Sequence, residues 1–296
     1  MSGAAEKARE KEVAMKASQP AQVKAHPITR PARSHARVSV VIPTLNEAAN
    51  LPHVFARLPF EELFEVILVD GHSSDDTIKI ARALYPSVRV VLQDGKGKGN
   101  ALACGFAAVR GDIVVMLDAD GSTDPQEIPA YVNALYEGAD FAKGSRFTDG
   151  GGSVDITPLR GLGNRFLNGT VNALFGTRYS DLCYGYNAFW SDVRPTLNVD
   201  CAGFEVETLI NVRAAKAGLN VAEVPSLEHE RIHGVSKLHP IRDGLRVLRT
   251  ILKERFARRD SRVAAVPNGR ELDAAGRMIS PLDGVEIEGL GLASAG

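Results

Sequence analysis

The chain has 296 residues, of which 44% are hydrophobic and 24% are charged, so it can bury a substantial core in one large domain or two small ones. Its formal net charge of −1 provides no global field for nucleic acid or membranes, so we expect no nucleic-acid partner and only local basic surfaces. The cysteines Cys104, Cys183 and Cys201 are odd in number and widely spaced, which argues against a disulfide framework or zinc site and fits a reducing cytosol.

Both ends of the chain differ in composition from its middle. Residues 1–36 are rich in Ala, Lys, Glu and Pro and lack the apolar segment of a signal peptide, which predicts a disordered N-terminal tail. Residues 261–296 show no convincing hydrophobic period, and we expect a second disordered tail there. The folded part is therefore predicted at residues 37–260, with halves at 37–145 and 146–260, and no stretch is apolar enough for a membrane span.

The first half alternates between two hydrophobic periods. Short β-branched runs predict buried strands at residues 38–42, 65–69, 88–92, 113–117 and 140–143. Helical patterns between them end near residues 58, 84, 110 and 138, and the last of these helices begins with a predicted capping box at Asp124 and Glu127. This order predicts an α/β fold with a Rossmann-like, mostly parallel sheet flanked by helices. The loops at 44–47, 70–76 and 118–122 should meet at one edge of that sheet.

The second half is predicted to be mainly helical. Helices are expected at residues 157–175, 205–217 and 241–257. The last helix places five apolar residues on one stripe: Ile241, Leu245, Leu248, Leu252 and Phe256. Between residues 231 and 259, Lys and Arg greatly outnumber Asp and Glu. A basic amphipathic helix of this kind is typical of anionic membrane surfaces, and a solvated helix face is the alternative.

Two carboxylates follow the strand predicted at residues 113–117. Asp118 and Asp120 are separated by Ala119, so both could reach one side of a turn and share a hard divalent cation with phosphate oxygens. Such a cation would stabilise negative charge on a leaving diphosphate. A solvated turn is the alternative, because a D-x-D triplet arises often by chance.

Other loops offer further candidate contacts. Asp70 ends the second strand and is followed by Ser73, Asp75 and Asp76. A carboxylate there could accept hydrogen bonds from a base or ribose, and helix capping by Ser74 or Asp75 is the alternative. The glycine-rich segment 95–99 opens a helix and suits an anion, although it matches neither a Walker A loop nor a dinucleotide fingerprint. His229 and His233 are four residues apart, but Gly234 interrupts the segment, which disfavours a metal site.

In order along the chain, these segments resemble family 2 glycosyltransferases with a GT-A fold. The first half carries this resemblance in residues 41–47 (VIPTLNE), 69–77 (VDGHSSDDT), 97–99 (GKG) and 118–120 (DAD). The second half resembles a narrower group, the polyprenyl-phosphate (dolichol-phosphate) mannosyl- and glucosyltransferases. Its matching segments are 143–147 (KGSRF), 180–182 (SDL), 204–207 (FEVE), 223–225 (EVP) and 234–237 (GVSK).

The resemblance implies roles for individual residues. Asp118 and Asp120 would hold Mg²⁺ or Mn²⁺. The nucleotide-sugar donor would contact Pro43, Asn46, Glu47, Asp70, Ser73, Asp75, Lys98, Asp118, Ala119 and Asp120. Donor or acceptor phosphates would meet Arg146, Arg160, Arg165, Arg231, Ser236 and Lys237. The candidate catalytic groups are Asp118, Asp120, Asp181, Glu205 and Glu207, of which the last three are candidate general bases for a hydroxyl acceptor.

The chain departs from this group at two positions. Gly71-His72 stands where Asp-Gly is frequent, and residues 183–187 (CYGYN) replace Thr-Gly-(Ser/Gly)-Phe-Arg, which removes a basic residue. The sugar and the acceptor therefore stay open. The chain also lacks the C-terminal membrane helices of many members, so we expect a cytoplasmic protein that binds the inner membrane surface peripherally, with a membrane-protein partner as one route to anchoring.

The predicted reaction is inverting transfer of a hexose from a nucleotide-sugar of the GDP-mannose or UDP-glucose type to a polyprenyl phosphate. The number of candidate cations favours this anionic acceptor. Three alternatives remain: a family 2 glycosyltransferase with a soluble sugar or natural-product hydroxyl acceptor, a sugar-phosphate nucleotidyltransferase, and a binding module without catalysis. The absence of glycine from residues 44–47 disfavours the nucleotidyltransferase, whose glycine-rich loop should follow the first strand.

Overall fold

The computed structural model describes residues 30–31, 36–235, 239–257 and 269–279. Its strands are β1 (Val38–Thr44), β2 (Glu65–Asp70), β3 (Arg89–Leu92), β4 (Ile113–Met116), β5 (Phe141–Ser145), β6 (Gly152–Ser153), β7 (Asn187–Trp190), β8 (Val221–Pro225), β9 (Leu227–Glu228) and β10 (Arg270–Leu272). Its α-helices are α2 (Leu51–Phe55), α3 (Thr77–Leu84), α4 (Gly97–Ala108), α5 (Ile128–Tyr136), α6 (Pro158–Phe175), α7 (Arg194–Leu197), α8 (Val206–Ala217) and α9 (Pro240–Phe256). None of the helices in these ranges is both long and apolar enough to cross a membrane.

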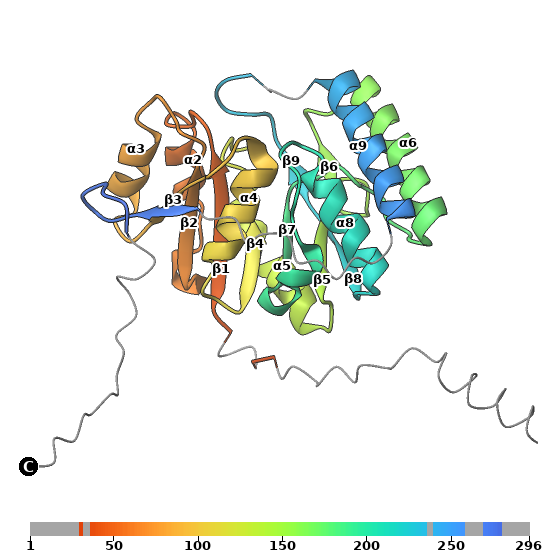
Figure 1. The fold of residues 1–296 in the computed structure, drawn as a ribbon, viewed down its shortest axis with the longest axis horizontal. Helices are drawn as coiled ribbons and strands as arrows, with labels where there is room; N and C mark the ends of the chain where they lie inside the picture. The colour runs from red at the N-terminus through yellow and green to blue at the C-terminus, as the bar shows by residue number, and fades with distance from the viewer. Residues whose placement is uncertain (1–29, 32–35, 236–238, 258–268, 280–296) are drawn as a thin grey trace, which may run out of the picture. The chain divides into compact units, whose positions relative to one another are not determined.

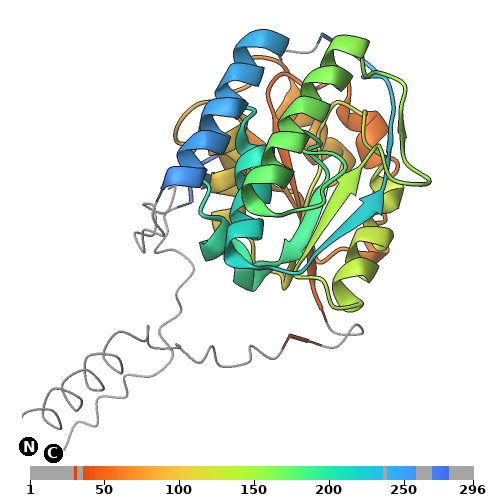
Figure 2. The same ribbon diagram turned by 90° about the vertical axis from the view of Figure 1, so that its right-hand side faces the viewer.

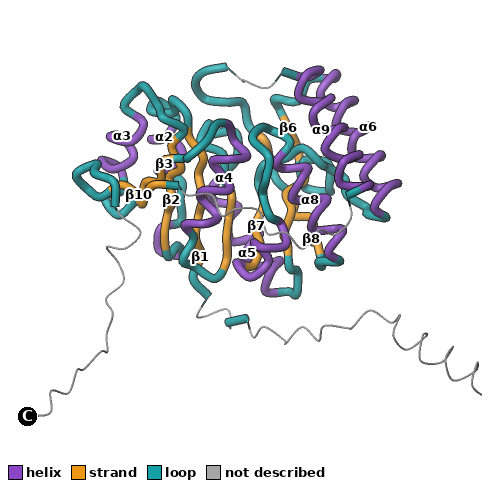
Figure 3. Tube along the Cα trace, in the orientation of Figure 1, coloured by secondary structure: helices purple, strands orange, loops and turns teal. Residues whose placement is uncertain are grey.

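Within the described residues, an eight-stranded sheet in the order β10-β3-β2-β1-β4-β7-β5-β8 forms the centre of the fold (Figures 1 and 3). β1 pairs in parallel with β2 and β4, and β2 pairs in parallel with β3. β7 is antiparallel to β4 and β5, whereas β8 is parallel to β5. The predicted mostly parallel α/β fold is therefore confirmed, and the second half completes the same sheet through β7 and β8.

Alternate residues of the central strands pack into two separate cores. On β1, Val40 and Ile42 join one cluster with buried residues of α2, α3 and α5. Val41 points to the opposite face and joins a cluster with α4, α7 and α8. Since side chains of a strand alternate between faces, a run that is apolar throughout indicates a sheet covered on both sides, which is the arrangement in Figure 1.

The helices α6 and α9 lie side by side beside α8 (Figures 1 and 2). Their inner faces form a third cluster that includes Val171 of α6 and Ile251 of α9. Their exposed large apolar residues are Leu159, Leu162 and Phe166 on α6, and Ile241, Leu245, Leu252 and Phe256 on α9. The predicted apolar stripe of the last helix is therefore largely exposed, and the buried face of α9 instead carries Asp243, Val247, Ile251 and Glu254.

The capping box predicted before α5 is only half formed. The Asp124 side chain accepts a hydrogen bond from the backbone N–H of Gln126 at 3.0 Å, so the N-cap is confirmed. The Glu127 carboxylate does not return to that cap but accepts from the Leu227 N–H at 3.0 Å and from the Ser226 hydroxyl. A short 3-10 turn over Pro125–Glu127 precedes the α-helix, so Glu127 serves the β8–β9 connection instead.

The expected C-terminal tail contains an ordered strand, so that prediction is wrong for residues 269–279. β10 pairs antiparallel with β3 at the edge of the sheet. Glu271 accepts from Arg89 Nε at 2.8 Å and from Arg110 Nη2 at 3.3 Å. Edge-strand pairing depends on a distant partner, which explains why the local pattern did not reveal it. Residues 261–268 and 280–296, and nearly all of 1–36, lie outside the described residues.

Candidate active site

The loops that follow β1, β2 and β4 meet at one edge of the sheet, as parallel pairing predicts. A cavity of about 300 Å³ begins at the loop after β4 and extends to α6 and α9. The predicted donor residues of the loops after β1 and β2 are not among its described lining residues. Its lining includes the charged residues Lys98, Asp118, Asp120, Glu207 and Arg231. It also includes the apolar residues Ile156, Leu159, Leu167, Ile241 and Val247. The site therefore combines a charged cluster with an apolar lining drawn mainly from the two exposed helices.

The glycine-rich turn at the start of α4 places Lys98 in this cavity. Gly97 adopts a φ of +85°, which L side chains rarely adopt. A Cβ on Gly99 would lie only 2.3 Å from the Cys201 carbonyl oxygen, and the Gly99 N–H donates to the Ala202 carbonyl at 3.0 Å. The glycines thus let α4 begin directly against the loop before α8.

Lys98 connects two carboxylates. Its Nζ lies 2.6 Å from Asp118 Oδ1 and 2.7 Å from Glu207 Oε1. Burial alone would lower the pKa of the Lys98 ammonium, but the two carboxylates outweigh it and raise that pKa above its ordinary value. Burial also raises the pKa of the Glu207 carboxyl, with Lys98 opposing the shift. A Cβ on Gly185 would lie 2.9 Å from Asp118 Oδ2, so a residue with a side chain there would disturb this cluster.

Asp120 is held by a second cation. Its Oδ1 accepts from the Ser122 N–H at 2.9 Å and from the Ser122 hydroxyl at 2.7 Å, while its Oδ2 lies 2.6 Å from Arg231 Nη2. Arg231 Nη1 also lies 3.4 Å from Glu47 Oε1. The guanidinium therefore bridges the loop after β1 and the loop after β4.

Arg231 belongs to residues 229–235, which we call the crossing segment because it passes over both loops. The His229 N–H donates to the Ser122 carbonyl at 2.8 Å, and the Ile232 N–H donates to the Asp120 carbonyl at 3.2 Å. The His233 N–H donates to the Asn50 side chain at 2.9 Å. Its backbone is thus attached on both sides of Arg231.

The predicted donor residues after β1 and β2 are brought together. Asp70 Oδ1 accepts from the Ser73 N–H at 2.8 Å, and the Ser73 hydroxyl accepts from the Asn46 N–H at 2.9 Å. Asn46 has a φ of 60°, the left-handed conformation that Asn tolerates. Asp75 accepts from the Thr77 N–H at 3.0 Å, but the N-cap residue of α3 is Asp76, whose side chain makes no cap hydrogen bond. These loops are pre-shaped by their own polar side chains.

Arg146 also lines the cavity, where carboxylates engage its guanidinium. Its Nε and Nη2 donate to Asp181 at 2.7 and 3.0 Å, and its Nη1 donates to Glu228 at 2.9 Å. The guanidinium carbon also lies 4.9 Å from the centre of the Tyr184 ring. Burial by itself would raise the pKa of Asp181, but Arg146 lowers it below its ordinary value. All three donor nitrogens of Arg146 are therefore engaged by carboxylates.

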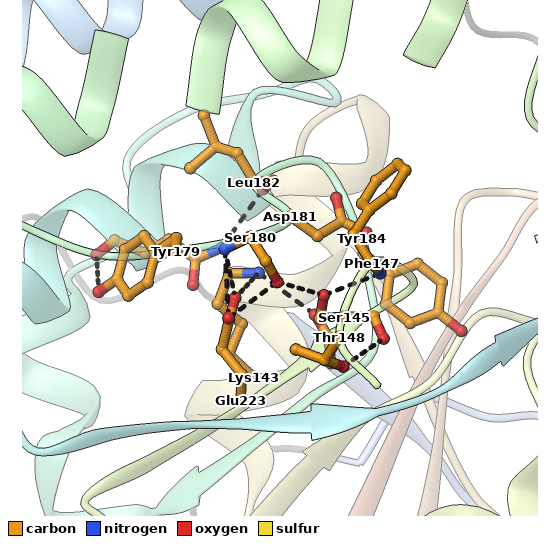
Figure 4. A network of polar contacts seen from close by, with 12 residues as sticks. Lys143, Ser145, Phe147, Thr148, Tyr179, Ser180, Asp181, Leu182, Tyr184 and Glu223 are labelled. Carbon is orange, nitrogen blue, oxygen red and sulfur yellow. Dashed lines mark hydrogen bonds and ion pairs between the residues drawn. The ribbon is translucent and has the colours of Figure 1, made fainter. Parts of the chain in front are cut away.

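A buried polar network supports this pair (Figure 4). Glu223 accepts from the Ser180 N–H at 2.9 Å and from its hydroxyl at 2.8 Å. The Ser180 hydroxyl also lies 2.6 Å from the Ser145 hydroxyl. Lys143 is fully buried with its Nζ 3.7 Å from Glu223, and burial lowers the pKa of this ammonium. The network joins β5, β8 and the loop that carries Asp181.

Some of the remaining predicted residues line the cavity and others do not. Of the three candidate bases, Glu207 lines the cavity, whereas Asp181 and Glu205 are not among the described lining residues. Arg160 lines the cavity with its Nη1 3.2 Å from Asp155, while Arg165 is exposed and does not line it. Ala119 is buried and Pro43 is half-buried in β1. Ser236 and Lys237 lie outside the described residues.

Sequence reasoning missed several lining residues. Glu228, Asp155 and Asp243 contribute carboxylates to the cavity, and Tyr184 contributes its ring. Asp243 offered a signal, because it is one of few acids in a strongly basic helix. Among the described residues, no group of three or more His, Cys, Asp or Glu side chains could hold a metal ion.

The chain belongs to glycosyl transferase family 2, whose model matches residues 39–200. It is 32% identical over 209 residues to glycosyltransferase AglJ of Haloferax volcanii, covering 70% of this chain and 68% of that protein. It is 35% identical over 218 residues to polyprenol monophosphomannose synthase of Mycolicibacterium smegmatis, covering 68% of this chain and 81% of that protein. The chain spans between 53% and 81% of the length of these and similar curated relatives.

Solved structures agree with this assignment. Glucosyl-3-phosphoglycerate synthase from Mycobacterium tuberculosis, solved with Mn²⁺, UDP and glucosyl-3-phosphoglycerate, superposes with a TM-score of 0.61. The two chains are 26% identical, and the match covers 76% of this chain and 82% of that one. The chain is therefore a glycosyltransferase with a GT-A fold, which confirms the predicted class.

Proposed function

We propose that this glycosyltransferase moves a hexose from a nucleotide-sugar to a polyprenyl phosphate. The observation that carries the proposal is the composition of the cavity, where Lys98 and Asp118 share a lining with Leu159 of α6 and with Ile241 and Val247 of α9. The charged part of this lining suits a phosphate group, and the apolar part suits an isoprenoid chain. The curated relatives named for polyprenol and dolichol phosphates support this acceptor.

The residues present fit a divalent cation. Asp118 and Asp120 offer hard oxygen ligands, and in this structure Lys98 Nζ and Arg231 Nη2 each lie 2.6 Å from one of them, so the carboxylates already attract positive charge. Because the described residues contain no cluster of three or more side chains that could hold a metal ion, donor phosphate oxygens would have to complete the coordination. Bound Mg²⁺ or Mn²⁺ would act as a Lewis acid that stabilises charge on the departing diphosphate. The Mn²⁺ in the solved synthase supports this requirement.

The proposed reaction is a single displacement. A phosphate oxygen of the acceptor forms a bond to the anomeric carbon while the bond from that carbon to the nucleoside diphosphate breaks, with inversion. The acceptor oxygen is already anionic, so no strong general base is needed. Lys98 and Arg231 would stabilise the diphosphate, and the cavity would hold the two reactants in line. The proposed donor is a nucleotide-sugar of the GDP-mannose or UDP-glucose type.

The outer faces of α6 and α9 support a peripheral position on the inner membrane surface. Phe166 is 63% exposed and Phe256 is 80% exposed, and both occur beside exposed cations such as Arg165 and Arg255. Large apolar side chains flanked by Arg suit the headgroup region of an anionic bilayer. Such docking would also bring the cavity to the lipid acceptor.

A soluble phosphorylated acceptor is the second candidate. It is favoured by the similarity to glucosyl-3-phosphoglycerate synthase, which was solved with a glucosylated phosphoglycerate. Of the predicted bases, Glu207 is the one in the cavity for a hydroxyl acceptor, but it is engaged by Lys98 at 2.7 Å. Membership of family 2 argues against the nucleotidyltransferase alternative.

One assay separates these acceptors. The purified chain is incubated with Mn²⁺, radiolabelled GDP-mannose or UDP-glucose, and polyprenyl phosphate in anionic vesicles or phosphoglycerate in solution. We expect label in the butanol-extractable lipid, and its loss after EDTA treatment. Label appearing solely in water-soluble product, with either donor, would reject the lipid acceptor and support the second candidate.

A further inference from the structure

Asp118 and Asp120 each have a cationic side chain of the protein as a partner: Lys98 for Asp118 and Arg231 for Asp120. Lys98 lies within 2.9 Å of both oxygens of Asp118. Both oxygens of Asp120 are engaged as well, Oδ1 by Ser122 and Oδ2 by Arg231. A cation that binds Asp120 through Oδ2 must therefore compete with the Arg231 guanidinium.

The two cations are anchored differently. The Lys98 side chain is 14% exposed and is held between Asp118 and Glu207. The Arg231 side chain is 26% exposed, and its second contact, to Glu47, has the longer distance of 3.4 Å. Of these two side chains, Arg231 can move at the lower cost, because it is more solvated and less tightly paired.

The backbone around Arg231 allows the side chain to move by itself. Hydrogen bonds from His229 and Ile232 attach the crossing segment to the carbonyls of Ser122 and Asp120. The Ile232 side chain also fits against Gly121, where a Cβ would lie 2.6 Å from it. Release of the guanidinium from Asp120 is therefore a rotation of one side chain over a fixed backbone.

We propose that Arg231 is the internal counter-ion of the metal site, bound to Asp120 until a divalent cation arrives and then transferred to the diphosphate that enters with it. Its contact with Glu47 keeps the guanidinium at the cavity wall during the exchange. The guanidinium would thus move from one oxyanion to another, and the metal site would have low affinity until the nucleotide supplies a new partner for Arg231. The second half of this inference rests on the proposed use of a nucleotide donor.

The test measures Mn²⁺ binding in two states of the protein. Free Mn²⁺ is followed by electron paramagnetic resonance, first with Mn²⁺ alone and then with UDP or GDP present. Removal of the competing charge in Arg231→Gln should tighten binding of Mn²⁺ alone by about three- to tenfold. The same change should weaken binding of the nucleoside diphosphate with Mn²⁺ by about tenfold, because a charge-assisted hydrogen bond to phosphate is lost.

The matched control is Arg57→Gln. Arg57 pairs with Asp124 through Nε at 2.9 Å, so it is also an arginine bound to an aspartate near this loop, but neither residue is among the described lining residues. The Arg57→Gln substitution should leave the affinity for Mn²⁺ alone and the affinity for the nucleoside diphosphate with Mn²⁺ unchanged. Arg231→Lys keeps the charge and should restore Mn²⁺ affinity towards the wild-type value, and circular dichroism checks that each variant is folded.

In Arg231→Gln, the expected result is tighter binding of Mn²⁺ alone and weaker binding of the nucleoside diphosphate with Mn²⁺. A purely structural role for Arg231 would weaken both affinities, and unchanged or weaker binding of Mn²⁺ alone in Arg231→Gln would overturn the proposal. Tighter Mn²⁺ binding with unaltered diphosphate binding would overturn the transfer to phosphate. If the wild-type protein binds neither UDP nor GDP with Mn²⁺, the proposed function fails, whereas the measurement with Mn²⁺ alone still decides whether Arg231 is the counter-ion.

Discussion

The substitution Lys98→Met removes the positive charge between two carboxylates while keeping a side chain of similar length. Lys98 Nζ lies 2.6 Å from Asp118 and 2.7 Å from Glu207, and the Glu207 side chain is 6% exposed. Removing one partner of a buried ion pair destabilises a protein by about 3–5 kcal/mol. Asp118 is 26% exposed and can be partly solvated, so we expect a loss of about 3 kcal/mol in the free energy of unfolding.

The same variant should show a distinctive pH dependence. Burial already raises the pKa of Glu207, and loss of Lys98 should raise it further. A carboxyl group whose pKa is higher in the folded state binds its proton more tightly when folded. The variant should therefore regain stability as the pH falls through that raised pKa, by at most about 1.4 kcal/mol per pH unit. Mn²⁺ should also restore part of the lost stability, because it supplies the missing charge.

Urea denaturation followed by circular dichroism measures these changes between about pH 8 and pH 5. The control is Lys79→Met, since Lys79 is 77% exposed and lies 3.8 Å from Asp76 in a surface pair. That change should cost less than about 0.5 kcal/mol at any pH in the range. A Lys98→Met protein within about 1 kcal/mol of wild type, or one that gains nothing on acidification, would refute the electrostatic reasoning.

Three further predictions concern other parts of the molecule. Asp120→Asn should lower kcat by about 100-fold or more and weaken Mn²⁺ binding, because it removes a metal ligand. The double change Phe166→Ser and Phe256→Ser should reduce sedimentation with anionic vesicles by about tenfold, because two side chains that are 63% and 80% exposed lose their apolar surface. Glu271→Gln should lower the free energy of unfolding by about 1–2 kcal/mol at pH 7, since the Arg89 hydrogen bond depresses the pKa of Glu271. The wild-type protein should lose the same stabilisation by ionised Glu271 as the pH falls through that depressed pKa, so the two proteins should become similar in stability in acid.

The vesicle prediction has a control variant, and each of the other two predictions has an outcome that would refute it. Thr170→Ala changes the half-buried part of α6 and should leave vesicle binding intact, so equal losses in both proteins would refute a specific role for the phenylalanines. The vesicle variants should still bind UDP or GDP with Mn²⁺. Full activity of Asp120→Asn at saturating Mn²⁺ would rule out Asp120 as a ligand. A Glu271→Gln protein with wild-type stability at pH 7 and in acid would show that β10 gains little from its ion pairs.

The central strands could be predicted from sequence because each is a short, locally continuous apolar run. Residues 38–42 and 65–69 carry β-branched side chains on both faces, and β1 and β2 occupy nearly those bounds. β7 and β8 escaped prediction, and both pair with strands distant in sequence, at β4 and β5. Their burial comes from neighbours that no local window contains.

Some features of the candidate site could likewise be predicted from the sequence, and others could not. Asp70 and Asp118 could be predicted to lie at the same edge of the sheet, because each lies at the carboxyl end of one of its parallel strands. That Arg146 would be engaged by Asp181 and Glu228 could not be predicted, since the three residues come from separate segments. Glu207 and Glu205 were equivalent candidates in the sequence, and only the orientation of α8 directs Glu207 to Lys98.

The sequence by itself therefore determined the class of fold, the order of the elements in its first half and the strand-end carboxylates, because those depend on hydrophobic period and on residues adjacent to a strand. The tertiary structure decided which charges neutralise one another and which helix faces stay exposed. Leu252 and Phe256 occupy the same stripe as Leu248, yet α9 turns its buried face to α8 through Val247 and Ile251. Such choices depend on the surfaces that neighbouring elements offer, and these exist only after the chain has folded.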